Sequence, residues 1–349
     1  MSAAPELSVI VPAYRAVQLL PDTLAALVAS DLPRDRWELI VVDDASGDDT
    51  GAIAARWADR VLILDGPPGG PGRGRNAGAT IATGRWLVFV DQDVRVHRDT
   101  LSRIATNAAE QPDLVAMFGT YDEHPAERGV LSEYRNLLHR QVHCAGAGNA
   151  ETFWAGCGAV RRDAFEAVNG FDVVRFPRGQ IEDIELGYRL RDRGGRILLD
   201  PSIQGTHLKR WTFGVMLRTD FRDRGIPWMR LLLERGNRTA AALNTGRAEQ
   251  LKVVLAAGAV VLLLAALPLR DPRLAIAGLA AVVALLVSNA RTYAWFARQR
   301  SWGFALLVIP LNLLYYVGNA VAAAAGVWQH LTAARSTARR MQPERGADA

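Results

Sequence analysis

Cysteine is scarce in this chain, and neither of the two residues present occurs in a motif with a known chemical role. Cys144 and Cys157 do not form a CxxC pair, so we expect both to pack as small apolar side chains in a reducing compartment. His139 and His143 occur in the segment HRQVH, which lacks the glutamate of the HExxH zinc motif. The sequence therefore predicts no zinc site.

The glycine-rich segment GPPGGPGRGRNAG lacks what either common nucleotide motif requires. A P-loop needs a Lys followed by Ser or Thr, and the segment contains none of these. A dinucleotide fingerprint reads GxGxxG after the first strand, whereas Gly72, Gly74 and Gly78 give GxGxxxG after the third. These absences disfavour a P-loop hydrolase and a dinucleotide dehydrogenase. We expect instead a flexible loop bearing Arg73 and Arg75 at the start of a helix, where backbone N–H groups can face an anion.

An excess of basic residues is absent from the first 250 residues, which argues against nucleic acid as a partner. The chain has a net charge of +5, but residues 251–349 carry ten basic and three acidic side chains, a net charge of +7, which leaves about −2 for residues 1–250. The positive charge flanks long apolar runs, as the positive-inside rule expects of a membrane protein. No secretory signal precedes the first predicted strand, so we expect the N-terminal domain to stay in the cytosol.

Three apolar runs near the C-terminus predict membrane-spanning helices, since about 20 apolar residues cross a hydrocarbon core. Residues 252–269 and 274–290 are predicted to form a transmembrane hairpin. Residues 303–328 form a run of 26 uncharged residues, which we expect to cross as a third span. The prolines and asparagines of this run leave a re-entrant or in-plane helix as the alternative.

The flanking segments complete the predicted membrane region. Residues 212–250 mix apolar side chains with Arg and Trp, which is typical of helices lying in the membrane interface. The loop Arg291–Gly303 carries three Arg and is predicted to face the cytosol together with the N-terminal domain. Residues 330–349 are predicted to be a basic, disordered tail, which a third span would place outside.

Short apolar runs alternate with helical patterns in the N-terminal half. Residues 7–13, 37–42, 61–64 and 86–93 predict strands. Such alternation indicates an α/β domain with a parallel sheet and helices on both faces. Ligands of these sheets bind beyond the carboxyl ends of the strands. The following segment has an α+β pattern, with a helix predicted over residues 181–193.

Acidic residues follow two of the predicted strands. Asp43 and Asp44 end WELIVVDD, and Asp91 and Asp93 end WLVFVDQD. Side chains two residues apart in an extended chain point to the same side, so Asp91 and Asp93 should converge and hold a cation or a proton between them. The alternative is that these acids merely mark the exposed ends of strands. An acidic pair at the start of the predicted helix 181–193 likewise complements the helix dipole.

These motifs, in this order over residues 7–211, resemble those of inverting family 2 glycosyltransferases with the GT-A fold. VDDASGDDT resembles the nucleotide-binding acids, and GRGRNAG with WLVFVDQD resembles the ARN loop and DxD segment. RRDAFEAVNGFD and IEDIELGYRL resemble the acceptor-side motifs, and DPSIQGTHLKRW the closing strand. The resemblance implies a Rossmann-like GT-A domain over residues 1–211, followed by transmembrane helices. It also implies a multi-pass enzyme of the bacterial inner membrane, with its catalytic domain in the cytosol.

The same resemblance implies a role for individual residues. It implies that the donor nucleotide contacts Pro12, Tyr14, Asp43, Asp44, Arg75 and Asp91. It implies that Mg²⁺ or Mn²⁺ is held by Asp93, Asp91 and His207. It places Trp154, Arg210 and Trp211 on the acceptor side. Inversion needs a base for the attacking hydroxyl, and the candidate is Asp183, with Glu182 beside it.

Two departures from the family pattern restrict the mode of transfer and the class of acceptor. The frame that reads QxxRW in processive synthases reads HLKRW here, which predicts transfer of a single sugar. The DADLQ pattern of dolichol-phosphate-type enzymes reads DQDVR here, which favours a hydroxyl on a lipid-linked or membrane-proximal glycan in cell-envelope synthesis. Two alternatives remain. One is a polyprenyl-phosphate sugar synthase, whose anionic acceptor needs no base, and the other is a catalytically silent membrane scaffold.

Overall fold

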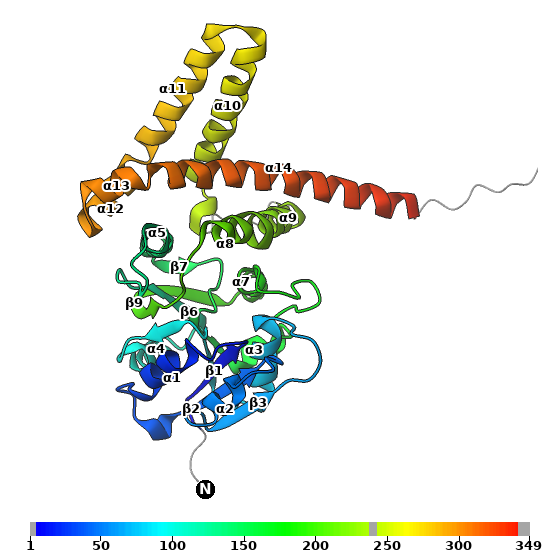
Figure 1. The fold of residues 1–349 in the computed structure, drawn as a ribbon. Helices are drawn as coiled ribbons and strands as arrows, with labels where there is room; N and C mark the ends of the chain where they lie inside the picture. Colours follow the sequence, from blue (N-terminus) through cyan, green and yellow to red (C-terminus); the bar gives the residue numbers. More distant parts are fainter. Residues whose placement is uncertain (1–4, 237–242, 341–349) are drawn as a thin grey trace, which may run out of the picture. The chain divides into compact units, whose positions relative to one another are not determined.

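The computed structural model describes residues 5–236 and 243–340. The chain divides into two compact units, and each is described by itself (Figure 1). The N-terminal unit comprises residues 1–212 and 241–246, and the helical unit comprises residues 213–240 and 247–349.

A mixed β-sheet forms the core of the N-terminal unit (Figure 1). Its strands are β1 (Leu7–Ala13), β2 (Trp37–Asp43), β3 (Arg60–Ile63), β4 (Trp86–Val90), β5 (Val94–Val96), β6 (Leu114–Tyr121), β7 (Gly148–Ala150), β8 (Cys157–Arg161) and β9 (Arg196–His207). They lie in the order β3-β2-β1-β4-β8-β6-β9-β5, and β7 pairs with β9. Strands β1 to β4 are parallel, as predicted. The following segment, predicted as α+β, makes the sheet mixed, because β8 runs antiparallel to both β4 and β6.

The helices of this unit are α1 (Leu20–Val28), α2 (Thr50–Ala54), α3 (Pro71–Ile81), α4 (Thr100–Glu110), α5 (Val130–Ala145), α6 (Arg162–Ala167) and α7 (Glu182–Asp192). Strands β2 and β3 are added on one side of β1, and β4 is added on the other side, so the strand order reverses at β1. Right-handed crossovers then place α1 and α2 on one face of the sheet and α3 on the other. Ligands of open α/β sheets bind at such a reversal, where the carboxyl ends of β2 and β4 carry the predicted acids.

Helix α3 contains the GRGRNAG segment, so the expectation of a flexible loop there is wrong. Gly74 and Gly78 face the sheet, where a Cβ on Gly78 would lie 2.5 Å from Ile10 Cγ2 and one on Gly74 would lie 3.0 Å from Pro12 Cβ. The glycines therefore let α3 pack directly on β1. This close packing, rather than phosphate binding, accounts for their spacing.

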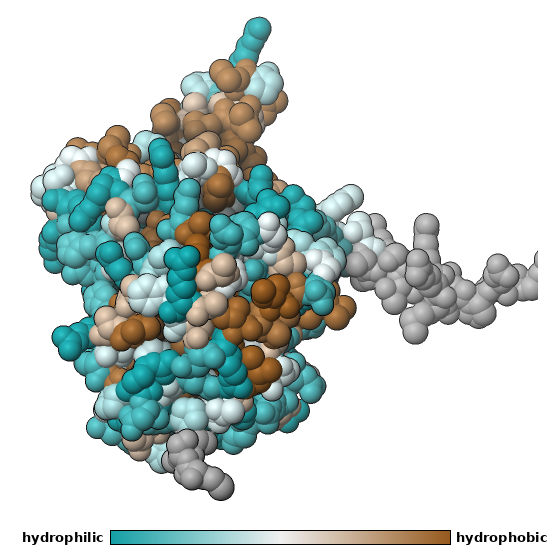
Figure 2. Space-filling model, turned by 60° about the horizontal axis from the view of Figure 1, so that its bottom comes forward, coloured by the Kyte–Doolittle hydropathy of each residue, from teal (hydrophilic) through white to brown (hydrophobic). Residues whose placement is uncertain are grey.

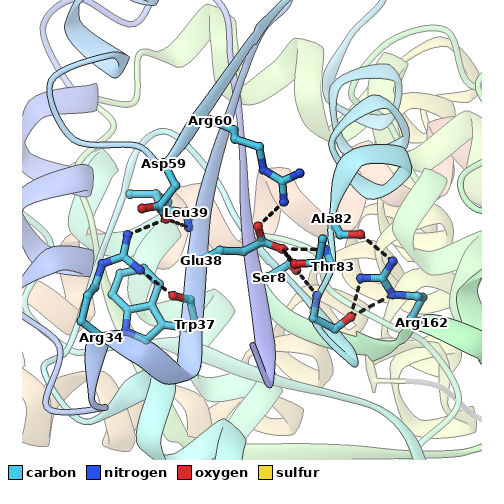
Figure 3. A network of polar contacts seen from close by, with 11 residues as sticks. Ser8, Arg34, Trp37, Glu38, Leu39, Asp59, Arg60, Ala82, Thr83 and Arg162 are labelled. Carbon is cyan, nitrogen blue, oxygen red and sulfur yellow. Dashed lines mark hydrogen bonds and ion pairs between the residues drawn. The ribbon is translucent and has the colours of Figure 1, made fainter. Parts of the chain in front are cut away.

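A polar network closes the opposite, amino-terminal edge of the sheet (Figure 3). Glu38 of β2 accepts hydrogen bonds from Ser8 Oγ at 2.6 Å and from Thr83 N and Oγ1 at 2.6 and 2.7 Å, and it pairs with Arg60. Arg162 donates to two carbonyl oxygens of the adjoining turn. Burial alone would raise the pKa of Glu38, but the hydrogen bonds from Ser8 and Thr83 outweigh it and lower that pKa. The network ties the starts of β1, β2, β3 and β4 together.

The helical unit contains α8 (Phe213–Arg218), the π-helix η2 (Thr219–Gly225), α9 (Ile226–Arg235), α10 (Arg247–Leu269), α11 (Pro272–Ser288), α12 (Ala290–Gln299), α13 (Trp302–Leu307) and α14 (Ile309–Arg340). Two predictions need correction. The segment Arg291–Gly303, predicted as a loop, is mostly the helix α12. Residues 330–340, predicted as part of a disordered tail, continue α14, while residues 341–349 lie outside the described residues.

Helices α10 and α11 form an antiparallel hairpin whose outer surface is apolar. Many large apolar side chains on it are more than half exposed, among them Leu251, Val254, Val261, Leu264, Leu267, Ile276, Leu279, Val283 and Val287. Figure 2 shows hydrophobic residues gathered on this projecting hairpin. Over the described residues, α10 and the segment Trp302–Thr332 are each long and apolar enough to cross a membrane, and α11 and α12 together make a pair bent by 50°.

Candidate active site

The DQD segment forms a turn between β4 and β5 instead of the end of an extended strand. The N–H of Val94 donates to the carbonyl oxygen of Asp91 at 3.0 Å, and the N–H of Leu208 donates to that of Asp93 at 2.9 Å. The same-side argument from strand alternation is therefore wrong for this pair. Burial raises the pKa of Asp91, and the charge of Asp93 in the same turn adds to the rise.

A buried arginine joins this turn to α7. Arg75 of α3 donates from Nη2 to Asp91 Oδ1 at 2.6 Å and from Nη1 to Glu182 Oε1 at 3.0 Å. Its side chain is 4% exposed, and its guanidinium lies over the ring of Phe171 at 5.4 Å. The bridge connects residues that are 107 positions apart in the sequence. It brings the predicted donor-side and acceptor-side acids into one charge cluster.

The charges of the bridge affect one another strongly. Withdrawal from water raises the pKa of Asp91 and of Glu182 more than the Arg75 guanidinium lowers them. Burial would lower the pKa of Arg75, but the two carboxylates outweigh it and keep the guanidinium charged. Arg75, predicted to face phosphate, thus has its Nη atoms on protein carboxylates.

The two acids at the start of α7 have different surroundings. Glu182 is 4% exposed, and besides Arg75 it accepts a hydrogen bond from the N–H of Gln180 at 2.8 Å. Asp183 is only half-buried, and its Oδ2 accepts from the N–H of Ala155 at 3.2 Å. Of the pair, Asp183 has the more exposed side chain.

Asp93 and His207 face each other at the end of β9, with 3.8 Å between Asp93 Oδ2 and His207 Nε2. Burial would raise the pKa of Asp93, but the neighbouring His207 and Lys209 outweigh it, so the pKa is lowered and the carboxylate stays ionised. Among the described residues, no group of three or more His, Cys, Asp and Glu side chains is placed to hold a metal ion. Asp91, the third predicted metal ligand, accepts a hydrogen bond from Arg75 on its Oδ1.

The acids after β2 organise the surrounding loops. Asp44 is buried, and its Oδ2 accepts from the N–H groups of Gly69 and Gly70, both at 2.7 Å. The anion expected at the start of α3 is therefore this carboxylate. Asp43 is also buried and accepts from the N–H of Ser46 at 3.0 Å. The two acids hold the rim where the predicted donor pocket lies.

Gln92, between the two acids of DQD, was not singled out from the sequence. Its Oε1 accepts from the N–H of Tyr14 at 2.6 Å, and its Nε2 donates to the carbonyl oxygen of Tyr14 at 3.2 Å. Its own carbonyl oxygen accepts from Thr23 Oγ1 at 2.8 Å. Gln92 therefore fastens the DQD turn to the end of β1, next to Pro12. Its place between two acids was the only signal available in the sequence.

The predicted acceptor-side tryptophans belong to a cluster of rings around His207. Tyr121 stacks on His207 with 4.3 Å between centroids and also contacts Trp154 edge-on at 4.9 Å. Trp211 lies 6.3 Å from His207, and Lys209 Nζ sits 4.7 Å from its ring. The structure thus joins Trp154 and Trp211 to the Asp93 side of the site, whereas Arg210 is exposed. Tyr121, which links them, was missed by sequence reasoning.

Comparison with known proteins gives a family match over residues 8–168, which fit the family model "Glycosyl transferase family 2". The chain is 34% identical over 102 residues to TarS, a poly(ribitol-phosphate) beta-N-acetylglucosaminyltransferase of Staphylococcus aureus, a stretch that is 28% of this chain and 18% of TarS. It is 26% identical over 231 residues to the glycosyltransferase AglE of Haloferax volcanii, which covers 63% of this chain and 72% of AglE.

A solved structure has the same fold. The mannosyltransferase PcManGT from Pyrobaculum calidifontis, determined in complex with GDP-Man and Mn²⁺, aligns with a TM-score of 0.56 and 20% identity, over 94% of this chain and 88% of that one. The candidate site lies at the carboxyl ends of β2 and β4, the edge at which open α/β sheets bind ligands. Residues 8–168 thus form the greater part of a GT-A domain that belongs to glycosyl transferase family 2.

Proposed function

We propose that this protein is an inverting glycosyltransferase that moves one sugar from a nucleotide-sugar donor to a hydroxyl of a lipid-linked or membrane-proximal acceptor in cell-envelope synthesis. The observation that carries the proposal is the Arg75 bridge between Asp91 and Glu182. It holds the donor-side turn and the start of α7 together, so that Asp183 lies beside the cluster in which the donor would bind.

Two relatives support a nucleotide-sugar donor. PcManGT was solved with GDP-Man, and the name of TarS describes transfer of N-acetylglucosamine to poly(ribitol-phosphate). In this chain the base and ribose would lie against Pro12, Tyr14, Asp43 and Asp44, at the edge that Gln92 fastens.

The donor set at Asp93 and His207 fits a divalent cation. An ionised carboxylate and an imidazole face each other there, and Mg²⁺ or Mn²⁺ commonly takes one or two protein ligands with substrate phosphate oxygens completing its shell. Asp93 and His207 would hold the ion, with Asp91 adjoining. When bound, it would neutralise the charge of the diphosphate leaving group.

Asp183 would act as the base. A hydroxyl is a poor nucleophile until its proton is taken, and the half-buried carboxylate of Asp183 at the start of α7 is the candidate to take it. Attack on the anomeric carbon from the side opposite the diphosphate would form the new glycosidic bond, release the nucleotide and invert the configuration.

The apolar helices support attachment to a membrane. The helical unit follows directly after the N-terminal unit in the chain, and its α10–α11 hairpin exposes the apolar side chains that a bilayer would cover. Basic residues flank the hairpin, as the positive-inside rule expects. We place the protein in the bacterial cytoplasmic membrane with the N-terminal unit in the cytosol.

The test is a screen of nucleotide-sugar donors by nucleotide release, with the detergent-solubilised full chain and membrane lipid extract as acceptor. We expect one donor to release nucleotide in an acceptor-dependent way, loss of this release in excess chelator, and loss in Asp93→Asn. Asp99→Asn, which changes an exposed aspartate on the surface pair with Arg103, is the matched control and should keep full activity. Full wild-type activity in chelator would contradict the metal assignment, and absence of release with every donor would favour the silent scaffold.

A further inference from the structure

Composition alone allows the helical unit as many as three crossings. Helix α10 and the segment Trp302–Thr332, which contains α13 and α14, are each long and apolar enough, and the bent pair α11–α12 could be one more. The contacts that α14 makes within the helical unit decide which of these is consistent with the packing.

The middle of the segment Trp302–Thr332 is fixed to one end of the hairpin. The hydroxyl of Tyr316 lies 2.9 Å from both Glu249 Oε2 and Asn289 Oδ1. Glu249 is in the first turn of α10 and Asn289 follows the last turn of α11, so both lie at the end of the hairpin away from its turn. Glu249 also pairs with Lys252 at 2.6 Å, and such charges belong at the membrane surface rather than in its core.

The two halves of α14 contact different neighbours. Its first turns contact the base of the hairpin through Tyr316 and contact α12 through Asn312, which accepts a hydrogen bond from Tyr293 OH at 2.8 Å. Farther along, a Cβ on Gly225 would lie 2.6 Å from Ala322 Cβ, and one on Gly326 would lie 2.7 Å from Met229 Cβ. Gly225 ends η2 and Met229 lies in α9, so this half packs on the arginine-bearing helices that precede α10. Figure 1 shows α14 running across the base of the hairpin rather than beside it.

Length then argues against a crossing. With Tyr316 at the base of the hairpin, 14 residues of the segment precede it and 16 follow it, or about 21 and about 24 Å at about 1.5 Å per residue. The hydrocarbon core is about 30 Å thick, so neither half can cross it alone.

Besides the two faces of α14 that pack on protein, a third face carries exposed apolar side chains. At about 100° per residue, Asn312 and Tyr316 share one sector and Ala322 and Gly326 another, which are the two sectors that pack on protein. Val321, Trp328 and Leu331 lie in the remaining sector and are 52, 69 and 52% exposed. Helix α13 also exposes apolar side chains, with Trp302 and Leu306 66 and 64% exposed.

We infer that α13 and α14 lie in the plane of the membrane interface, with the Val321–Trp328–Leu331 strip as a lipid-binding surface, and that the chain crosses the membrane twice. The inference rests on the membrane attachment proposed above. It replaces the predicted third span, and it keeps the basic C-terminal end on the cytosolic side, in agreement with the positive-inside rule.

The test measures depth in the bilayer with spin labels on the full chain. Single cysteines replace Val321 or Leu331 in a Cys144→Ser, Cys157→Ala background, reconstituted in phosphatidylglycerol–phosphatidylethanolamine vesicles. The two positions are ten residues apart, so a crossing helix separates their depths by about 15 Å, whereas an in-plane helix gives nearly equal, shallow depths. Leu251 and Val261 of α10 are the matched control pair, equally spaced and 59 and 64% exposed.

We expect equal depths for the α14 pair and a difference of about 15 Å for the α10 pair. A similar difference in the α14 pair would overturn the inference and restore the third span. Labels that remain in water would contradict the assignment of the strip as a lipid-binding surface. Equal depths in the α10 pair would instead contradict the membrane crossing itself. An Ala347→Cys variant should stay unlabelled by impermeant maleimide in intact cells, while Asp271→Cys in the hairpin turn should be labelled. Outside labelling of position 347 would also overturn the two-span topology.

Discussion

Replacing Arg75 by Met leaves two buried carboxylates without their cation. The guanidinium is 4% exposed and bridges Asp91 and Glu182 at 2.6 and 3.0 Å. Removing one partner of a buried ion pair costs about 3–5 kcal/mol. The Asp91 side chain is 30% exposed, which places the expected loss in the free energy of unfolding at the lower end, about 3 kcal/mol. With a urea m value of about 3 kcal/mol/M, the unfolding midpoint should fall by about 1 M at pH 8.

The pH dependence gives the sharper test. Burial already raises the pKa of Asp91 and of Glu182, and without Arg75 both should rise further. A carboxylate with a raised folded-state pKa costs stability above that pKa, and the cost disappears as it protonates at lower pH. The deficit of Arg75→Met should therefore shrink between pH 8 and pH 5, as followed by tryptophan fluorescence during urea unfolding of the full chain in detergent. Arg103→Met, which breaks the exposed pair with Asp99, is the control and should cost no more than about 0.5 kcal/mol. A loss below about 1 kcal/mol for Arg75→Met at both pH values would refute the reasoning.

Two further predictions concern Glu38 and Gln92. Glu38→Gln should lower the free energy of unfolding by about 1–3 kcal/mol at pH 7, because it weakens a network built on an ionised acceptor. The folded-state pKa of Glu38 is lowered, so this contribution is present above the unfolded value of 4.5 and is lost as the pH falls through the folded-state pKa. Urea titrations should therefore show wild type and variant converging at acid pH, and a difference that is independent of pH would refute this. Gln92→Leu should raise the KM for the donor about tenfold with kcat within about twofold, since it frees the end of β1 from the DQD turn. An unchanged donor KM would remove Gln92 from the positioning of the site.

The local pattern of apolar residues was sufficient to predict the first strands and helices. The apolar run of residues 7–13 coincides with β1, and the run of residues 37–42 is one residue short of β2. The alternation of these runs also predicted the parallel pairing of β1 to β4, because short crossovers leave few other arrangements. The antiparallel β8 was not predictable in this way, since nothing in its own residues states which neighbour it joins.

The sequence predicted which acidic residues lie at the candidate site, but not which residues they pair with. Strand ends located Asp43, Asp44, Asp91 and Asp93 correctly at one edge of the sheet. The partners of these acids depend on segments distant in sequence, as with Arg75 and Glu182, which are 107 residues apart. The strand rule failed at DQD because a turn hydrogen bond from Val94 to Asp91 replaces the extended backbone. For α14, composition predicted a long apolar helix, whereas its packing on the hairpin depends on side-chain contacts such as those of Tyr316.

The most direct test of the proposed chemistry is single-turnover sugar transfer by Asp183→Asn, measured together with a titration of the nucleotide-sugar donor. A positioned carboxylate contributes about 10²–10⁴-fold to removal of a hydroxyl proton, so we predict transfer at least about a hundredfold slower with donor affinity nearly unchanged. Asp99→Asn makes the same change on an exposed side chain that pairs with Arg103, and should leave transfer unaffected. Transfer by Asp183→Asn within a few-fold of wild type would contradict the hydroxyl acceptor, and would favour a polyprenyl-phosphate acceptor that needs no base.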